Sequence, residues 1–255
     1  MRPGRAATHR RRTWVGDHRR RGPRRRRTLS GQDEMIGGSG NLVCFSFYAN
    51  KNLTTAEGGM VTTADAALAE QLAIWRLHGL SRDAWKRYQS RRLMLSDVIC
   101  AGYKYNMTDL QSSLGIHQLH KQPAFLQTRE RYARLYDEAF DALPGVRRQP
   151  RPDDGQNRHA LHLYVLILDR EQFRVDRNQI VAALLAENVG AALHYRALHT
   201  HPFYQNRFRY RPGDYPCAAE VGESIFTLPL TPGMSEANVS EVIEAVYKVL
   251  SAYRR

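Results

Sequence analysis

The chain has 255 residues, with 38 Lys and Arg against 25 Asp and Glu, which gives a formal net charge of +13. This length suits one large domain or two small ones, and an apolar fraction of 42% excludes a wholly disordered chain. The longest apolar run, residues 161–168, is too short to cross a bilayer, so we expect no membrane-spanning helix.

The basic excess is concentrated at the N-terminus. Residues 1–34 hold 12 Arg, no Lys and 3 acids, and they show no helical or strand periodicity, so we expect an Arg-rich disordered tail. One interpretation is an arm that binds nucleic acid or another acidic surface. The other is sequence from a different reading frame, because Arg outnumbers Lys 33 to 5 and out-of-frame GC-rich codons yield Arg, Gly and Pro. We favour the second and expect no specific nucleic-acid binding.

From residue 35 onward, strands and helices alternate, which indicates an α/β or α+β fold. A buried strand over 41–48 precedes a polar loop, a short strand over 60–63 and a helix over 64–78. Thr108 and Gln111 form a capping box for a helix that reaches Lys121. Pro123 predicts a break before a second helix over 124–143.

The C-terminal part continues the alternation. We expect a strand over 161–168, a helix over 180–188 opened by Asp176 and Gln179, a short strand over 191–195 and a strand over 224–230. A final amphipathic helix has an apolar stripe made of Val239, Val242, Ile243, Val246, Val249, Leu250 and Tyr253.

The segment richest in chemical information is residues 46–60, SFYANKNLTTAEGGM. It places Lys51 just past the buried strand, among Ser, Asn and Thr, in a chain with only five lysines. Partial desolvation would lower the pKa of the Lys51 ammonium and free the amine to attack a carbonyl. On chemistry alone, a loop lysine that faces water stays open as the alternative.

Residues 46–59 resemble the cofactor-lysine motif S-F-x-A-x-K-N-x-T-x-x-E-G-G of the DegT–DnrJ–StrS family of sugar-nucleotide aminotransferases, and every fixed position matches. These are fold type I enzymes that depend on pyridoxal phosphate (PLP). The resemblance implies that Lys51 binds PLP covalently and acts as general base, and that Ser46 donates a hydrogen bond to the cofactor phosphate.

Two further segments support the resemblance. Residues 102–111, GYKYNMTDLQ, are similar to the family's G-Y-x-Y-x-M-T-D-x-Q run, which implies that Asn106 reaches the phosphate of the partner subunit in a homodimer. A place just before a helix N-cap also explains Asn106. Residues 194–204 are similar to the H-Y-x-P-L-H-x-H-P-x-Y stretch near the substrate, so His194 and Tyr195 are candidates for substrate contact, although Ala197 replaces the common Pro.

The resemblance divides the chain into the C-terminal part of the large PLP-binding domain, residues 35–125, and a small C-terminal α+β domain, residues 126–255. Family members carry a region before the position of Met35 that supplies a turn for the phosphate, an aromatic side chain over the ring and an Asp for the pyridine nitrogen. We therefore expect an N-terminally truncated member with little or no activity alone.

The implied reaction transfers the amino group of glutamate to a keto group of a nucleotide-linked sugar, for cell-surface polysaccharide or antibiotic sugar biosynthesis. The amino-acid sequence of residues 102–109 favours a UDP-4-keto sugar as the substrate. Two alternatives stay open: a PLP-dependent sugar dehydratase, in which His replaces the lysine, and a catalytically silent fragment. The expected partners are the nucleotide sugar, glutamate and a second copy of the chain.

The spacing of the cysteines and histidines gives expectations about the cellular compartment and about a metal site. The three cysteines form no C-x-x-C pair, which indicates a reduced, cytoplasmic compartment. Five histidines between 159 and 201 have no cysteine or carboxylate at ligand spacing, so we expect no metal site.

Overall fold

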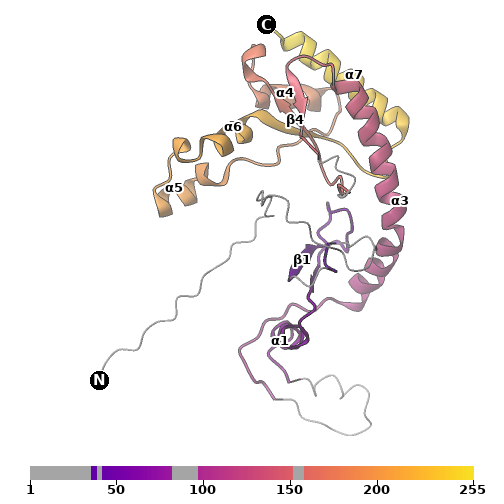
Figure 1. The fold of residues 1–255 in the computed structure, drawn as a ribbon, viewed down its shortest axis with the longest axis vertical. Helices are drawn as coiled ribbons and strands as arrows, with labels where there is room; N and C mark the ends of the chain where they lie inside the picture. The colour runs from indigo at the N-terminus through magenta and orange to yellow at the C-terminus, as the bar shows by residue number, and fades with distance from the viewer. Residues whose placement is uncertain (1–35, 39–41, 82–96, 152–157) are drawn as a thin grey trace, which may run out of the picture.

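The computed structural model describes residues 36–38, 42–81, 97–151 and 158–255 (Figure 1). The tail predicted for residues 1–34 lies outside them. The described residues form a two-stranded and a three-stranded antiparallel sheet, with the long helix α3 beside both (Figure 1). The strands are β1 (Val43–Ser46), β2 (Gly59–Thr62), β3 (Val146–Arg148), β4 (Tyr164–Leu168) and β5 (Ile225–Leu228).

The first sheet pairs β1 with β2; β1 is shorter at both ends than the predicted strand over 41–48, and β2 has the predicted length but begins one residue earlier. Helix α1 (Ala66–Trp75) follows, and its N-cap Asp65 accepts a hydrogen bond from the Leu68 amide at 3.0 Å. The helix ends at Trp75, three residues before the predicted end at 78, and Gly79 in the following turn has a φ of +68°. A side chain at Gly79 would overlap the Cys100 carbonyl, so this turn requires glycine.

Helix α3 (Asp109–Phe140) corrects the prediction of two helices, because it runs without a break through Pro123. The Thr108–Gln111 capping box is confirmed. Pro123 removes the amide that would bond the Leu119 carbonyl, but both residues are exposed, so water can satisfy that carbonyl. The helix curves along the right of the molecule in Figure 1.

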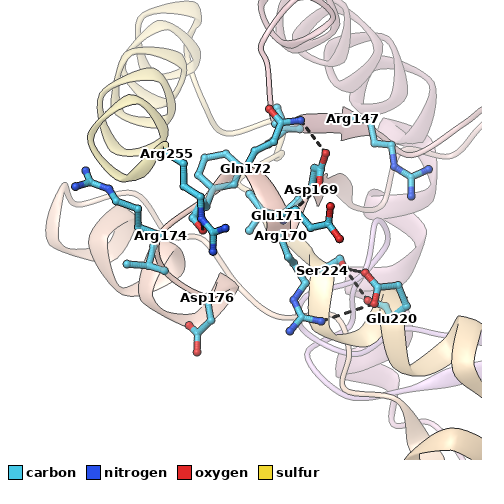
Figure 2. Close-up of a pocket in the computed structure, with 15 residues that line it drawn as sticks. Arg147, Asp169, Arg170, Glu171, Gln172, Arg174, Asp176, Glu220, Ser224 and Arg255 are labelled. Atoms are coloured by element: carbon cyan, nitrogen blue, oxygen red, sulfur yellow. Dashed lines mark hydrogen bonds and ion pairs between the residues drawn. The ribbon is translucent and has the colours of Figure 1, made fainter.

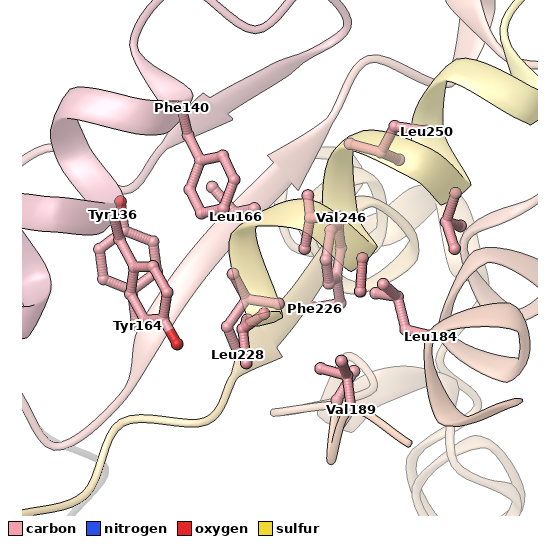
Figure 3. Close-up of a cluster of buried hydrophobic side chains, with 14 of the residues drawn as sticks. Tyr136, Phe140, Tyr164, Leu166, Leu184, Val189, Phe226, Leu228, Val246 and Leu250 are labelled. Carbon is pink, nitrogen blue, oxygen red and sulfur yellow. The ribbon is translucent and has the colours of Figure 1, made fainter. Parts of the chain in front are cut away.

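The second sheet, in the order β3-β4-β5, carries the hydrophobic core (Figure 3). β4 alternates buried and half-buried residues, and all four residues of β5 are buried. Helices α4 (Arg177–Ala186) and α7 (Glu236–Tyr253) pack together and cover the sheet. The predicted signal at Asp176 forms a capping box, and Ser235 forms one that was not predicted. Five residues of the predicted apolar stripe of the final helix are buried, and Ile243 and Tyr253 are partly buried against the core.

Three predicted strands are shorter than expected. The strand over 161–168 begins only at Tyr164, because Leu161 has a φ of +48°, outside the β region. The strand over 224–230 ends at Leu228, before Pro229. The strand over 191–195 is a single bridge between Ala192 and Thr227, so that prediction was wrong.

Several elements were not predicted. They are β3, α5 (Pro202–Phe208), α6 (Pro216–Ser224) and the short 3₁₀ turns over 170–172, 198–200 and 212–214. Each is short, and both extra helices begin at a proline, which fits the first turn of a helix. None of the helices among the described residues is long and apolar enough to span a bilayer.

The core is unevenly placed along the chain. Its buried residues all lie between Tyr132 and Leu250. By contrast, α1 has no buried residue, and the N-terminal half of α3 exposes Leu110, Leu114, Ile116 and Leu119.

Candidate active site around Lys51

Residues 47–58, which connect β1 to β2, form a closed loop that carries Lys51. Its base is fixed by the Phe47 amide, which donates to the Gly58 carbonyl at 2.9 Å, and by the Thr55 amide, which donates to the Phe47 carbonyl at 3.0 Å. The Lys51 amide donates to the Tyr48 carbonyl at 3.0 Å, so Lys51 closes a turn within the loop. We call residues 47–58 the lysine loop.

Two glycines at the end of the lysine loop have a structural reason. Gly58 has a φ of +155°, and a side chain there would overlap Thr55 Oγ1 and lie 2.9 Å from the Met107 Cε atom. A side chain at Gly59 would lie 2.8 Å from the Phe45 carbonyl oxygen. The paired glycines of the motif therefore allow the loop to return closely onto β1.

Asn52 ties the lysine loop to the rest of the chain. Its Nδ2 donates to the Ala160 carbonyl at 2.6 Å, and its Oδ1 lies 3.3 Å from His162 Nδ1. The backbone carbonyl of Asn52 accepts from Gln122 Nε2 on α3 at 2.7 Å. Lys51 is thus held where the first sheet, α3 and the entry to β4 meet.

The positive charge of Lys51 affects the pKa values of two histidines from distant segments. Burial lowers the pKa of His162, and the positive charges of Lys51, Arg129 and His194 lower it further. Burial, and then the charge of Lys51, also lowers the pKa of His194. Both imidazoles are therefore mostly neutral at pH 7, where the positive charge that acts on them comes from Lys51 and, at His162, from Arg129 as well.

The predicted substrate residues lie together. His194 Nδ1 is 2.8 Å from Thr227 Oγ1 on β5, and Tyr195 packs edge-on against the His194 ring with 4.9 Å between the centroids. The Tyr195 side chain is 65% exposed, which leaves its ring open to a ligand. The structure therefore places His194 and Tyr195 side by side next to β5, and the positive charge of Lys51 acts on His194.

The two predicted phosphate residues are placed differently. Ser46 is the exposed last residue of β1, and its Oγ accepts from the Tyr48 amide at 3.4 Å, so it lies at the base of the lysine loop. Asn106 lies two residues before the N-cap of α3, and its Oδ1 accepts from Lys104 Nζ. Among the described residues, no hydrogen bond joins Asn106 to the lysine loop.

The sequence analysis did not identify Asn52, Gln122 and Thr227 as site residues. Asn52 follows the lysine in the motif, which was the one available signal. Gln122 and Thr227 carry no local signal, because their contacts join segments 70 and 35 residues apart.

A large groove lies elsewhere, with a volume of about 790 Å³ between the β3–β4 edge and the end of α7 (Figure 2). Its polar groups satisfy one another: Gln172 donates to Asp169, Ser224 donates to Glu220, and Arg255 donates to the Phe173 carbonyl. None of the predicted site residues lines it, so this groove is not the candidate site.

The described residues contain no group of three or more His, Cys, Asp or Glu that could hold a metal ion. His199 is buried with its Nε2 3.2 Å from the Pro212 carbonyl, which gives it a structural partner. His199 therefore has a structural role, whereas His162 contacts the lysine loop and His194 contacts Thr227.

Comparison with known proteins decides the family. The DegT/DnrJ/EryC1/StrS aminotransferase family matches residues 28–247. The chain belongs to this family. Spore coat polysaccharide biosynthesis protein SpsC of Bacillus subtilis is 43% identical to it over 220 residues, which are 86% of this chain and 56% of SpsC. The chain therefore spans about half the length of the curated relatives it matches.

Solved structures agree with this assignment. The putative sugar aminotransferase Spr1654 of Streptococcus pneumoniae, in its PMP form, matches with a TM-score of 0.74 and 30% identity over 83% of this chain and 53% of that chain. Helicobacter pylori PseC, an aminotransferase involved in pseudaminic acid biosynthesis, matches with a TM-score of 0.74 and 27% identity over 83% of this chain and 54% of PseC. The predicted α/β class of the fold type I transferases is confirmed.

Proposed function

We propose that this chain is the lysine-bearing part of a PLP-dependent aminotransferase that moves the amino group of glutamate to a keto group of a nucleotide-linked sugar, with a UDP-4-keto sugar favoured. The observation that carries the proposal is the setting of Lys51. Its amine has no hydrogen bond or ion pair with a described residue, yet its loop is fixed by Asn52, which contacts the Ala160 carbonyl and His162. A free amine on a fixed loop suits attack on an aldehyde.

The residues present fit PLP by their chemistry. Lys51 supplies the amine for the aldehyde, and the exposed Ser46 hydroxyl supplies a donor for the phosphate. The permanent charges that act on His162 are those of Lys51 and Arg129, so the surroundings favour an anionic group. When bound, PLP supplies an electron sink that makes the Cα–H bond of an amino acid acidic.

The chain's own side chains have separate tasks. Lys51 holds the cofactor and then, once released, takes and returns the proton at the substrate Cα through its Nζ. Asn52 keeps the lysine loop at the meeting point with α3, so Lys51 Nζ returns to the same place after each release. His194 and Tyr195 stand at the substrate side, where Tyr195 offers an exposed ring.

We also propose a homodimer in which Asn106 reaches the partner's site, and a cytoplasmic location. The exposed apolar side chains of α3 between Leu110 and Leu119 support a further protein contact on this side. The free cysteines Cys44, Cys100 and Cys217 support a reduced compartment.

Visible absorbance of PLP mixed with the full chain tests the proposal. We expect a protein-bound PLP band that glutamate bleaches slowly at most, because the chain spans about half the length of its relatives, and a Lys51→Ala chain that never develops the band. The matched control, Lys121→Ala, changes an exposed lysine of α3 and keeps the band. A silent fragment instead gives no band with the unsubstituted chain, and glutamate then changes nothing.

A further inference from the structure

The first turns of α3 have one half-buried side, and that side is polar. Between positions 109 and 122 the half-buried residues of this helix are Gln111, Ser112, Gly115, Gln118 and Gln122, and the others are exposed. Positions three, four, seven and eleven apart on an α-helix lie on the same face, so these residues form one stripe. Because none of them is a large apolar residue, hydrophobic burial does not hold this face in place, and specific contacts must do so.

Two glutamines of this stripe donate hydrogen bonds to the lysine loop. Gln111 Nε2 donates to the Glu57 carbonyl at 2.9 Å, and Gln122 Nε2 donates to the Asn52 carbonyl at 2.7 Å. Asn52 directly follows Lys51, and Glu57 lies at the end of the loop. Both acceptors are backbone groups, so α3 holds the main chain of the loop on either side of the segment between them.

Between the two glutamines, α3 and the lysine loop are already in contact. A side chain at Gly115 would lie 3.1 Å from the Thr55 Cγ2 atom, and Thr55 is only 1% exposed. Positions 111, 115 and 122 of the helix therefore meet positions 57, 55 and 52 of the loop in that order. The second half of the lysine loop consequently runs antiparallel along one face of α3.

Gln111 has two separate tasks. Its Oε1 accepts from the Thr108 amide and from the Thr108 hydroxyl, both at 3.0 Å, which closes the capping box of α3. Its Nε2 is then left for the Glu57 carbonyl, because the capping box fixes the orientation of the side-chain amide. A glutamate at this position would keep the acceptor for the capping box and lose only the donor to the lysine loop.

The other half of α3 gives these contacts a fixed frame. The helix runs without a break from Asp109 to Phe140, and Tyr132, Tyr136 and Phe140 belong to the hydrophobic core. The two glutamines therefore connect the lysine loop to a helix that is anchored in the core beside the second sheet.

We propose that Gln111 and Gln122 are positioning residues that fix the place of Lys51 Nζ through the backbone of the lysine loop. The proposal rests on the proposed function, which makes Lys51 the amine that binds PLP. Neither glutamine touches the reacting atoms. An amine that is held in place before the aldehyde arrives loses less freedom when it reacts, so loss of either donor weakens PLP binding.

Three variants of the full chain separate the loop contacts from the fold. Gln111→Glu and Gln122→Glu keep the shape of the side chain, but at neutral pH they have no donor for a carbonyl. The matched control is Gln127→Glu, which adds the same charge at an exposed position of the same helix. Circular dichroism should show the same helical content in all three, because Gln111→Glu retains the capping box.

Hydrogen exchange without PLP measures the lysine loop itself. The Lys51 and Thr55 amides donate to the Tyr48 and Phe47 carbonyls, so their exchange reports opening of the loop. We expect peptides over residues 51–58 to exchange about tenfold faster in Gln111→Glu and in Gln122→Glu, with α7 unchanged. Loop exchange as slow as in Gln127→Glu, in either variant, overturns the proposal.

The PLP affinity, measured from the protein-bound absorbance band, tests the effect on Lys51. Each of the two variants should bind PLP about tenfold more weakly, the value of one lost hydrogen bond, and Gln127→Glu should bind it like the unsubstituted chain. Equal PLP affinity in all three variants overturns the proposal. If the unsubstituted chain forms no band, the proposed function is wrong. Faster loop exchange then still supports the holding role of the glutamines, and unchanged exchange overturns it.

Discussion

Arg129, on the buried face of α3, donates from Nη1 to the carbonyl oxygen of Leu161 at 3.2 Å. The same nitrogen donates to the Leu230 carbonyl. Arg129 therefore joins α3 to the chain before β4 and to the chain after β5, one residue away from His162. Burial lowers the pKa of Arg129, and its charge in turn acts on His162, so this arginine links the core to the candidate site.

We expect Arg129→Met to reduce the free energy of unfolding by about 2–3 kcal/mol, because it leaves two buried carbonyls without their donor. The matched control is Arg131→Met on the same helix. The Arg131 side chain is 54% exposed and pairs with Glu236 at 3.3 Å in solvent, so its loss should cost under about 1 kcal/mol. Urea unfolding curves check both, and equal losses would contradict the bridging role of Arg129.

The charge of Lys51 lowers the pKa values of His162 and His194, so Lys51→Met should raise both. Neither should return to 6.5, because burial is the larger cause at each ring. Lys121→Met, on the exposed side of α3, should leave both unchanged. NMR titration of the imidazole signals measures the shifts, and unchanged values in Lys51→Met would place Lys51 away from the two rings.

The lowered pKa values also predict a pH dependence of stability. Because both folded pKa values lie below the unfolded value of 6.5, the unfolded chain takes up protons first as the pH falls. The free energy of unfolding should therefore be constant above about pH 7 with respect to these groups and fall as the pH drops below 6.5. His162→Gln should show a smaller fall than the unsubstituted chain, and an identical pH profile would contradict the assignment.

Gly58→Ala should distort the lysine loop, because Gly58 has a φ of +155° and an added methyl group overlaps Thr55 Oγ1. We expect a loss of about 1–3 kcal/mol in the free energy of unfolding. Gly213→Ala is the control, since its added methyl group meets no atom within 4 Å. Thermal unfolding compares the two, and a Gly58→Ala protein as stable as the control would show that the loop tolerates the side chain.

Ser235→Ala should cost about 1 kcal/mol, because Ser235 Oγ accepts from the Asn238 amide at 3.2 Å and closes the capping box of α7. Ser251→Ala, near the other end of the same helix and exposed, should change the stability by less than about 0.5 kcal/mol. Urea midpoints separate the two outcomes. Similar midpoints would mean that packing alone determines where α7 begins.

Local signals were readable from the sequence where the structure uses local contacts. The capping box at Thr108 and the apolar stripe of α7 depend on residues within a few positions of one another, and both are confirmed. Pro123 misled the analysis for a physical reason. Its effect depends on whether the freed Leu119 carbonyl reaches water, which only the exposed position of that turn in the fold decides.

In the candidate site, too, the local features were predictable from the sequence and the long-range contacts were not. The lysine motif predicted Lys51 just past the strand that contains Ser46, because the motif is continuous in sequence. The contact between Asn52 and His162 spans 110 residues, and the contact between His194 and Thr227 spans 33. Pairings of that range depend on how β4 and β5 meet the lysine loop, so no pattern in one segment predicts them.

The most direct test of the central claim is reduction of the full chain with borohydride in the presence of PLP, followed by peptide mass spectrometry. We expect a pyridoxyl adduct on Lys51 and none on Lys121, the exposed lysine of α3. Lys51→Ala should abolish the specific adduct while leaving the fold intact. Adducts spread evenly over the chain's lysines, or an adduct that survives Lys51→Ala, would contradict the assignment of Lys51 as the reactive amine.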